Sequence, residues 1–417
     1  MKTNKIHIVG GGIIGLCAAW FLKKEGYEVT IIDKDGFSDG TSYGNLGMIV
    51  PSHFVPMAAP GVISKGLRWL VNGKSPFNIK PRLDWDLIQW LWHFYRSANS
   101  QQVEASMPVL YELNERSKEL YKEISTENGF DFGFEERGLL MLFKTQKQAK
   151  EEESLAQRAK RIGVKTEMFD SKSLRSLEPE MELDVLGGIY FPGDAQLHPN
   201  QFMTQMTVQL KQLGVSFIPN ISVVDFKNKG SKIEALILED KSIITVENVL
   251  LSLGCWTGIL MKNAGLKIHL QNGNGYSFTF GKQKLRPHIP TILTEARVAV
   301  TPMGDDLRIG GTFEMSRLSE KINQNRIQGI KDGLSAYYKN LDISFTNETR
   351  VWKGYRPCTP DGMPYIGKSN ALTNLVVATG HGMMGLSLGA VTGKLISQIM
   401  TEQATLMDLF PFRLNRF

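Results

Sequence analysis

The sequence has few cysteines and no long apolar run. Three cysteines, Cys17, Cys255 and Cys358, stand far apart among 417 residues. Their number and spacing exclude a disulfide framework and a cysteine-based metal site, so we expect free thiols and no metal. No apolar run reaches the roughly 18 residues that a membrane-spanning helix needs. The N-terminus lacks the apolar region of a signal peptide, and we therefore expect a cytoplasmic protein.

The sequence also lacks concentrated charge, internal repeats and disordered tails. Its net charge is +6 and its pI is about 9.0, and the basic residues are spread along the chain. Such a mild bias gives no reason to expect a nucleic-acid partner. With 42% hydrophobic residues, the chain is long enough for two domains with separate cores. Glycine is abundant, and many of the 40 glycines stand in motifs.

The first motif is GGGIIGLCAAWFLKKEGYEVTIID, residues 10–33. The apolar pattern predicts a strand over 5–9, a helix over 13–25 and a second strand that ends at Asp33. Gly10 permits a tight turn, Gly12 lets a pyrophosphate approach the helix N-terminus, and Gly15 allows the helix to pack closely on the strand. Asp33 can accept hydrogen bonds from a ribose. The residues assigned to this dinucleotide site are Gly10, Gly12, Ile13, Ile14, Gly15, Asp33 and Lys34.

Three later segments favour FAD over NAD. Residues 41–53, TSYGNLGMIVPSH, offer small and polar side chains around which a ribityl phosphate could wrap. Residues 246–256 form a buried strand that ends at Gly254, and residues 374–400 a strand, a glycine turn and a helix beginning near Met384. The positive end of that helix could stabilise charge on a reduced flavin. The flavin contacts expected here are Thr41, Ser42, Asn45, Gly47, Met48, Gly254, Trp256, Gly380, Gly382, Met383, Met384 and Gly385.

The chain resembles the D-amino-acid oxidase superfamily, and within it the bacterial D-amino-acid dehydrogenase small subunits. The resemblance extends along nearly the whole chain, and the matching runs are GGGIIGLCAAWFL, TSYGNLGMIVPSHFVPMAAPGV, GLRWL, GYSFTF, GGTFEM, VWKGYRPCTPDGMPYIG and ATGHGMMG. The most specific is W-x-G-x-R-P-x-T-P-D-G-x-P-x-I-G, from Trp352 to Gly367. We expect an α/β fold, in which a Rossmann-like FAD-binding domain (1–60, 150–260 and 350–417) is interleaved with an α+β substrate-binding domain (60–150 and 265–350).

The resemblance implies FAD-dependent oxidative deamination of a D-amino acid to the imino acid, which hydrolyses to a 2-oxo acid, with electrons passed to a quinone or another non-oxygen acceptor. The family arginine that matches Arg356 grips the substrate carboxylate at two points. Tyr276 matches a region that presents polar groups to the substrate, and Val223 matches a residue whose backbone faces the adenine. His53 and His381 are further candidates, because both stand in segments expected at the flavin.

The substrate side chain and the acceptor stay open. The run PGDAQLHPNQF (192–202), His53 and Cys358 depart from the dehydrogenase pattern. A D-proline or hydroxy-D-proline dehydrogenase and an oxidase of glycine, sarcosine or another secondary amine are the alternative enzymes. A flavin-binding subunit of a larger complex is the non-enzymatic alternative, and homo-oligomerisation is left open.

An aromatic-rich helix is predicted over residues 83–98, LDWDLIQWLWHFYRSA. Its polar face lacks the lysines and arginines of a membrane binder, which favours packing in a core. Peripheral contact with the inner face of a membrane is the alternative. Further along, ARVAVTPM and DLRIGGTFE predict a hairpin with GDD at its turn.

Overall fold

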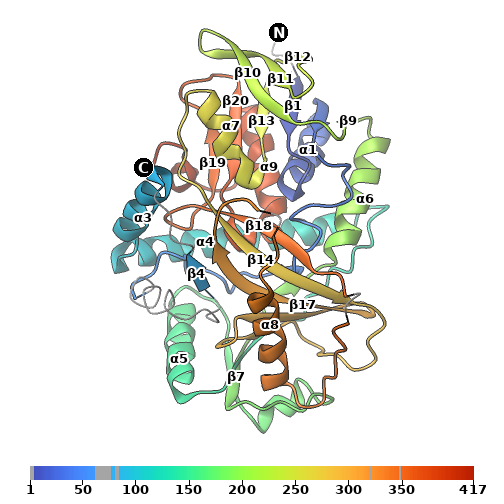
Figure 1. Cartoon of the computed structure of the whole chain (residues 1–417), viewed down its shortest axis with the longest axis vertical. Coiled ribbons are helices and arrows are strands. Elements are labelled where there is room, and N and C mark those ends of the chain that lie inside the picture. The colour runs from blue at the N-terminus through green and yellow to red at the C-terminus, as the bar shows by residue number, and fades with distance from the viewer. Residues whose placement is uncertain (1–3, 62–76, 80–83, 320, 347–348) are drawn as a thin grey trace.

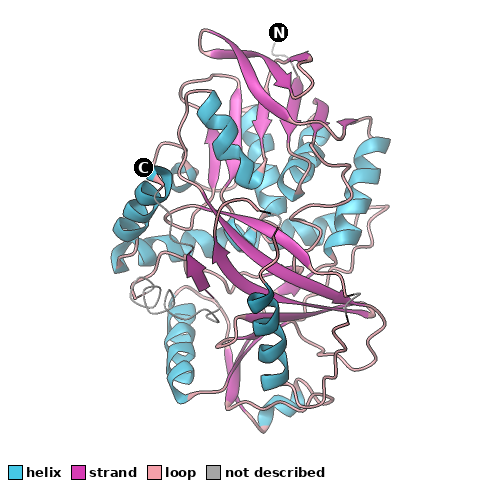
Figure 2. Ribbon diagram, in the orientation of Figure 1, coloured by secondary structure: helices cyan, strands magenta, loops and turns pink. Residues whose placement is uncertain are grey.

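The computed structural model describes residues 4–61, 77–79, 84–319, 321–346 and 349–417. The run GLRWL, residues 66–70, lies outside them. Two large sheets organise the described chain, one in the upper and one in the lower half of Figure 1. Helices flank both sheets, as Figure 2 shows. This mixed α/β architecture confirms the expected fold class.

The upper sheet has six strands, in the order β19 (Tyr365–Lys368), β20 (Leu375–Thr379), β13 (Val249–Leu251), β1 (Lys5–Val9), β2 (Glu28–Ile32) and β9 (Ser216–Ile218). All neighbours are parallel except β19 and β20. The strands are short and rich in Val, Ile and Leu, and the central strands β20, β13, β1 and β2 are largely buried, as a parallel sheet covered by helices requires. Strand β1 is followed by a glycine turn, then by helix α1 (Ile13–Lys24), and then by β2, which pairs with β1 in the same sheet. The predicted strand–helix–strand unit is therefore confirmed.

Helix α1 packs closely against α9 (Gly389–Thr401). A Cβ at Gly393 would lie 2.5 Å from the carbonyl carbon of Cys17, so the two backbones meet where glycine leaves room. Around them lie α4 (Ser100–Ser125) and α6 (Pro199–Gln212). A three-stranded sheet, β10 (Val223–Lys229), β11 (Lys232–Leu238) and β12 (Ile243–Thr245), lies at the top of Figure 1 with α7 (Thr257–Asn263) below it.

The lower sheet is mostly antiparallel. Its order is β18 (Trp352–Cys358), β14 (Gln271–Phe280), β17 (Asp306–Met315), β16 (Val298–Met303), β15 (Thr291–Leu293), β5 (Leu139–Phe143), β7 (Gly187–Phe191) and β6 (Glu167–Asp170), and β4 (Phe77–Ile79) pairs with β17. Strands β16 and β17 form the predicted hairpin, in which Met303 pairs with Asp306. Helices α5 (Gln146–Arg161) and α8 (Gln324–Tyr337) flank this half of the molecule (Figure 1). A short pair, β3 (Met48–Ile49) and β8 (Ala195–Gln196), lies off both sheets.

The sheets divide the chain differently from the expected domain boundaries. Segments β6 and β7, from residues expected in the FAD-binding domain, belong to the lower sheet, and so does β18. Strand periodicity tells which face of a strand is buried, but it does not tell which sheet the strand joins. Strand β18 is then followed directly by β19 of the upper sheet, so residues 352–368 lead from one half of the molecule to the other.

Two local expectations need correction. The helix expected to begin near Met384 begins at Gly389, because a 3-10 turn, η3 (Gly382–Met384), comes first. The aromatic helix is present as α3 (Trp85–Ser97), capped by the carboxylate of Asp84. Only one face of it enters a core, however, and Trp85 and Trp92 on the other face are 68% and 57% exposed. Packing of this helix in a core is therefore confirmed for Leu87, Trp90 and Phe94, and it does not extend to the two exposed tryptophans.

Candidate functional site

The glycine turn between β1 and α1 has the geometry of a phosphate-binding turn. Gly10 has φ +108°, and a Cβ there would lie 2.6 Å from the carbonyl oxygen of Ser252 on the neighbouring strand's end. A Cβ at Gly15 would meet the carbonyl oxygen of Gly10. Gly12 caps α1 without any side-chain hydrogen bond, and its own Cβ position meets only Ser42 Oγ at 3.5 Å. The start of the helix is therefore open to an anion.

The carboxylate of Asp33 lies beside this turn. Its Oδ2 accepts from the backbone N–H of Gly11 at 2.5 Å, and its Oδ1 accepts from the N–H of Asp35 at 2.8 Å. Burial raises the pKa of Asp33, and these two backbone hydrogen bonds oppose the rise. Lys34, the next residue, places its ammonium 4.1 Å from the ring centre of Trp256, so two expected cofactor contacts from distant parts of the chain are brought together.

The segment 41–48 is attached to the same turn. Ser42 Oγ accepts from the N–H of Ile13 at 3.0 Å. Asn45 Oδ1 accepts from the N–H of Gly47 at 2.9 Å. Gly47 has φ +72°, and a Cβ there would meet the carbonyl oxygen of Leu197. Thr41 is exposed, and Met48 pairs with Gln196 in the short β3–β8 ladder.

A second glycine-rich surface is formed where β13 and β20 end. Thr379 Oγ1 donates to the carbonyl oxygen of Gly254 at 2.9 Å, which joins the two strand ends. Gly254 and Gly382 have φ of +57° and +55°, and no heavy atom lies within 4 Å of either Cβ position. A flat ligand can approach such backbone closely. Strand β18 packs against the turns that contain Gly254 and Gly382. The backbones of Cys358 and His381 also form an isolated antiparallel β-bridge.

Arg356 of β18 is the charged group of this region. It is half-buried, and its Nη1 donates to the carbonyl oxygen of Thr312 at 2.6 Å. Its guanidinium lies against Gly275 and 5.9 Å from the ring centre of Phe313. Burial lowers the pKa of Arg356 to about 10, so the side chain is still a cation at neutral pH. A partly desolvated guanidinium of this kind suits a carboxylate ligand.

Tyr276 lies on the other face of the lower sheet. The guanidinium of Arg356 lies at the Cβ position of Gly275, and successive residues of a strand point to opposite faces. The Tyr276 ring is 1% exposed within the core of the lower half, and its hydroxyl accepts from the N–H of Asn323 at 3.2 Å. Contact between this ring and a substrate stays a prediction, which the geometry disfavours.

The two candidate histidines differ in their surroundings. His53 is half-buried with Nδ1 3.2 Å from Ser52 Oγ, and Ser52 donates to the buried carboxylate of Asp194. Burial, and then the charge of Arg297, lower the pKa of His53 to about 4. The buried ring of His381 is 3.0 Å from Thr392 Oγ1 on α9, and burial lowers its pKa to about 3. Both rings are therefore neutral at pH 7.

The remaining predicted contacts are spread around the upper sheet. Val223 begins β10 and packs with the core beneath the three-stranded sheet. Met384 packs against the cluster that contains Val50 and Phe54, whereas Met383 is exposed. Gly385 has only the Cβ of His381 within 4 Å of its own Cβ position.

Sequence reasoning missed Arg308 of β17. Its guanidinium is buried, and it donates to the backbone carbonyls of Tyr43 and Asn45, within the predicted flavin segment. The available signal was an arginine inside DLRIGGTFEM, where its near neighbours Leu307, Ile309, Gly310 and Gly311 are apolar or glycine. Arginine is almost never fully buried without a specific set of partners.

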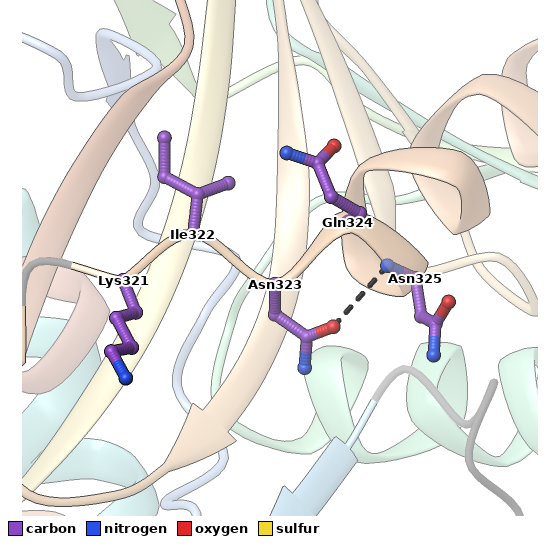
Figure 3. Close-up of a pocket in the computed structure, with 5 residues that line it drawn as sticks. All are labelled: Lys321, Ile322, Asn323, Gln324 and Asn325. Atoms are coloured by element: carbon purple, nitrogen blue, oxygen red, sulfur yellow. Dashed lines mark hydrogen bonds between the residues drawn. The ribbon is translucent and has the colours of Figure 1, made fainter.

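A depression of about 330 Å³ is lined by the consecutive residues 321–325 ahead of α8, which Figure 3 shows in close-up. Asn323 Oδ1 accepts from the N–H of Asn325 there. This segment is joined to Tyr276 and to Lys353, whose ammonium donates to the carbonyl of Lys321 at 3.0 Å. It therefore lies on the side of the sheet away from Arg356, and it offers no constellation of reactive groups.

Comparison with known proteins gives consistent results. A family model described as FAD dependent oxidoreductase (DAO) matches residues 5–399. Proteins called D-amino acid dehydrogenase from Granulibacter bethesdensis and Vibrio vulnificus are 28% and 29% identical over 419 residues, covering at least 98% of each chain. Among solved structures, glycine oxidase from Geobacillus kaustophilus matches with a TM-score of 0.79 at 20% identity over both full chains, and L-proline dehydrogenase from P. horikoshii with a TM-score of 0.73 at 20% identity, covering 100% of this chain and 98% of that one. The family resemblance and the expected flavin are confirmed.

Proposed function

The chain belongs to the family of FAD-dependent oxidoreductases, and from that premise we propose that it oxidises D-amino acids and passes the electrons to an acceptor other than oxygen. The observation that carries the proposal is the position of Arg356. This half-buried cation lies on the strand that packs against the two glycine turns at the ends of β13 and β20. The names of the relatives from Granulibacter bethesdensis and Vibrio vulnificus support the D-amino acid as substrate.

In this proposal the chain holds FAD through backbone more than through side chains. The open start of α1 would receive the pyrophosphate, and Asp33 the ribose. The glycines at 254 and 382, whose Cβ positions are empty, would allow close approach of the ring system. When bound, FAD accepts the two electrons and the hydrogen that leave the substrate Cα.

The chain's own groups would bind and orient the amino acid. Arg356 would hold the carboxylate, while the hydrogen bond from its Nη1 to the carbonyl of Thr312 fixes the orientation of the guanidinium. The rings of His53 and His381 are neutral at pH 7. They would therefore add no positive charge against an amine that must itself be neutral before oxidation. The protein's contribution is then orientation and charge complementarity, with no strong base required.

Turnover with a panel of D- and L-amino acids tests this function. The purified FAD-loaded protein is assayed once with an artificial dye as acceptor and once with oxygen, with peroxide measured. We expect dye reduction with D-amino acids, D-alanine and D-proline among them, and little peroxide. Peroxide release with glycine or sarcosine would instead identify an oxidase, and no turnover with any amino acid would support a subunit without activity of its own.

We also propose that the exposed face of α3 contacts a membrane surface, where a quinone acceptor would be available. Trp85, Trp92 and Tyr95 recur on this face, and Tyr95 is 64% exposed. Tryptophan and tyrosine favour the interface between lipid and water. Among the described helices, none combines the length and the apolar character needed to cross a membrane. The contact would therefore be peripheral.

Vesicle sedimentation tests the membrane contact. The wild-type protein should sediment with vesicles that contain anionic lipid, and the double variant Trp85→Ser, Trp92→Ser should lose at least half of that binding. Ile259→Ser, at an exposed apolar residue on α7, is the matched control. Equal sedimentation of the double variant and the wild type would contradict the proposal.

A further inference from the structure

Arg308 joins three parts of the molecule through four hydrogen bonds. Its Nε donates to Thr279 Oγ1 of β14 at 2.9 Å. Its Nη1 donates to the carbonyls of Tyr43 at 2.8 Å and Asn45 at 2.6 Å, and its Nη2 donates to Asn200 Oδ1 of α6 at 2.9 Å. One side chain thus connects the lower sheet, the segment 41–48 and a helix of the upper half.

The electrostatic situation of this guanidinium is unusual. The side chain is 3% exposed, and all four acceptors are neutral oxygens. Within the described residues no carboxylate forms an ion pair with it; Asp306 acts on it only at longer range. Burial lowers the pKa of Arg308 to about 10, so the protein retains a buried cation at a cost in free energy.

We propose that Arg308 is a positioning residue for the flavin, because it fixes the backbone of residues 43–45 from the side of the lower sheet. Two other contacts fix the same backbone: Ser277 Oγ donates to the carbonyl of Gly44 at 2.8 Å, and the ring of Trp352 lies against Gly44. Ser42, one residue earlier, binds the start of α1. Arg308 therefore orients the segment that runs from the pyrophosphate turn towards the ring system.

The geometry explains why an arginine is needed. The carbonyls of Tyr43 and Asn45, a hydroxyl and an amide oxygen surround the guanidinium, and a planar fork with five N–H groups can donate to all four at once. A lysine ammonium carries the same charge but has only three donors on a flexible stem. A neutral side chain would leave the carbonyls of Tyr43 and Asn45 with fewer partners in a buried region.

FAD titration of the apoprotein tests this inference, which rests on the proposed placement of the flavin at residues 41–48. Arg308→Gln should raise the Kd for FAD about tenfold or more, and Arg308→Lys should restore part of the affinity. Arg286→Gln is the matched control: Arg286 is on the same half of the molecule, but it donates to Gln283 and pairs with Asp305. Its Kd should stay within about twofold of the wild type.

The thermal unfolding temperature of each apoprotein separates positioning from general stability. The inference requires that the Kd rises in a variant whose apoprotein unfolds close to the wild-type temperature. If Arg308→Gln does not fold, the variants Asn200→Ala and Arg308→Lys test the inference in its place, and each should raise the Kd for FAD. An unchanged Kd in the folded variants, or an equal rise in Arg286→Gln, would overturn the role of Arg308. A wild-type protein that fails to bind FAD would overturn the proposed function instead.

Discussion

Replacing Arg356 by methionine removes the cation that we assign to the substrate carboxylate while it keeps most of the side-chain volume. The guanidinium is half-buried against Gly275 and Phe313, so a carboxylate bound there is partly desolvated. Truncating one partner of such a charge pair costs about 2–5 kcal/mol. At about 3 kcal/mol, kcat/KM should fall roughly 150-fold. Because the carboxylate is bound before and during the reaction, most of the change should be in KM.

Arg356→Lys refines the same test. The lysine keeps the charge but loses the two-point contact, and a loss of about 10- to 100-fold in kcat/KM is expected. Arg350→Gln is the control, since Arg350 lies two residues before β18 and is exposed at its ion pair with Asp39. The assay is dye reduction over a range of D-amino acid concentrations, with FAD content measured for each variant. Wild-type kinetics in a fully flavin-loaded Arg356→Met protein would refute the carboxylate role.

Three further predictions concern the cofactor, the pH dependence and the packing. Asp33→Ala should raise the Kd for FAD about tenfold in equilibrium dialysis, and an unchanged Kd would remove Asp33 from the ribose site. Burial raises the pKa of Asp194 from 3.8 to about 7, so between those pH values the folded protein binds a proton that the unfolded chain has released. Because the folded state binds this extra proton, the free energy of unfolding falls as pH rises, by up to about 1.4 kcal/mol per pH unit. Denaturation of Asp194→Asn from pH 4 to 7 should show a flatter profile than the wild type, and identical profiles would contradict the buried carboxyl's role. Gly393→Ala brings a Cβ within 2.5 Å of the carbonyl carbon of Cys17, and the free energy of unfolding should drop by about 1–3 kcal/mol; an equally stable variant would show that α1 and α9 can separate without cost.

The parts that sequence reasoning predicted well are those governed by local chemistry. The strand, turn, helix and strand over residues 5–32 follow from glycines whose backbone conformation only glycine adopts easily, as Gly10 illustrates with φ +108°. The β16–β17 hairpin likewise follows from its turn, in which Gly304 has φ +60°. Arg356 was singled out through the motif from Trp352 to Gly367, and the structure places it within β18.

The features that the sequence alone did not determine depend on tertiary contacts. Tyr276 and Gly275 are neighbours in sequence, and only the pairing of β14 with β18 decides which of them faces Arg356. Arg308 acts on carbonyls more than 260 residues earlier in the chain, for which no local pattern exists. On α3, Trp90 is buried and Trp92 exposed, and the apolar pattern alone does not distinguish a face packed in a core from one left in solvent.

Anaerobic titration of the purified protein with the two enantiomers of one amino acid tests the central claim most directly. Oxidised flavin absorbs near 450 nm (roughly the usual region), and without oxygen or dye its loss reports electron transfer from the substrate alone. We predict bleaching with the D-enantiomer, no bleaching with the L-enantiomer, and bleaching by Arg356→Met only at far higher concentrations. A colourless protein, or equal bleaching of wild type and Arg356→Met, would contradict the account.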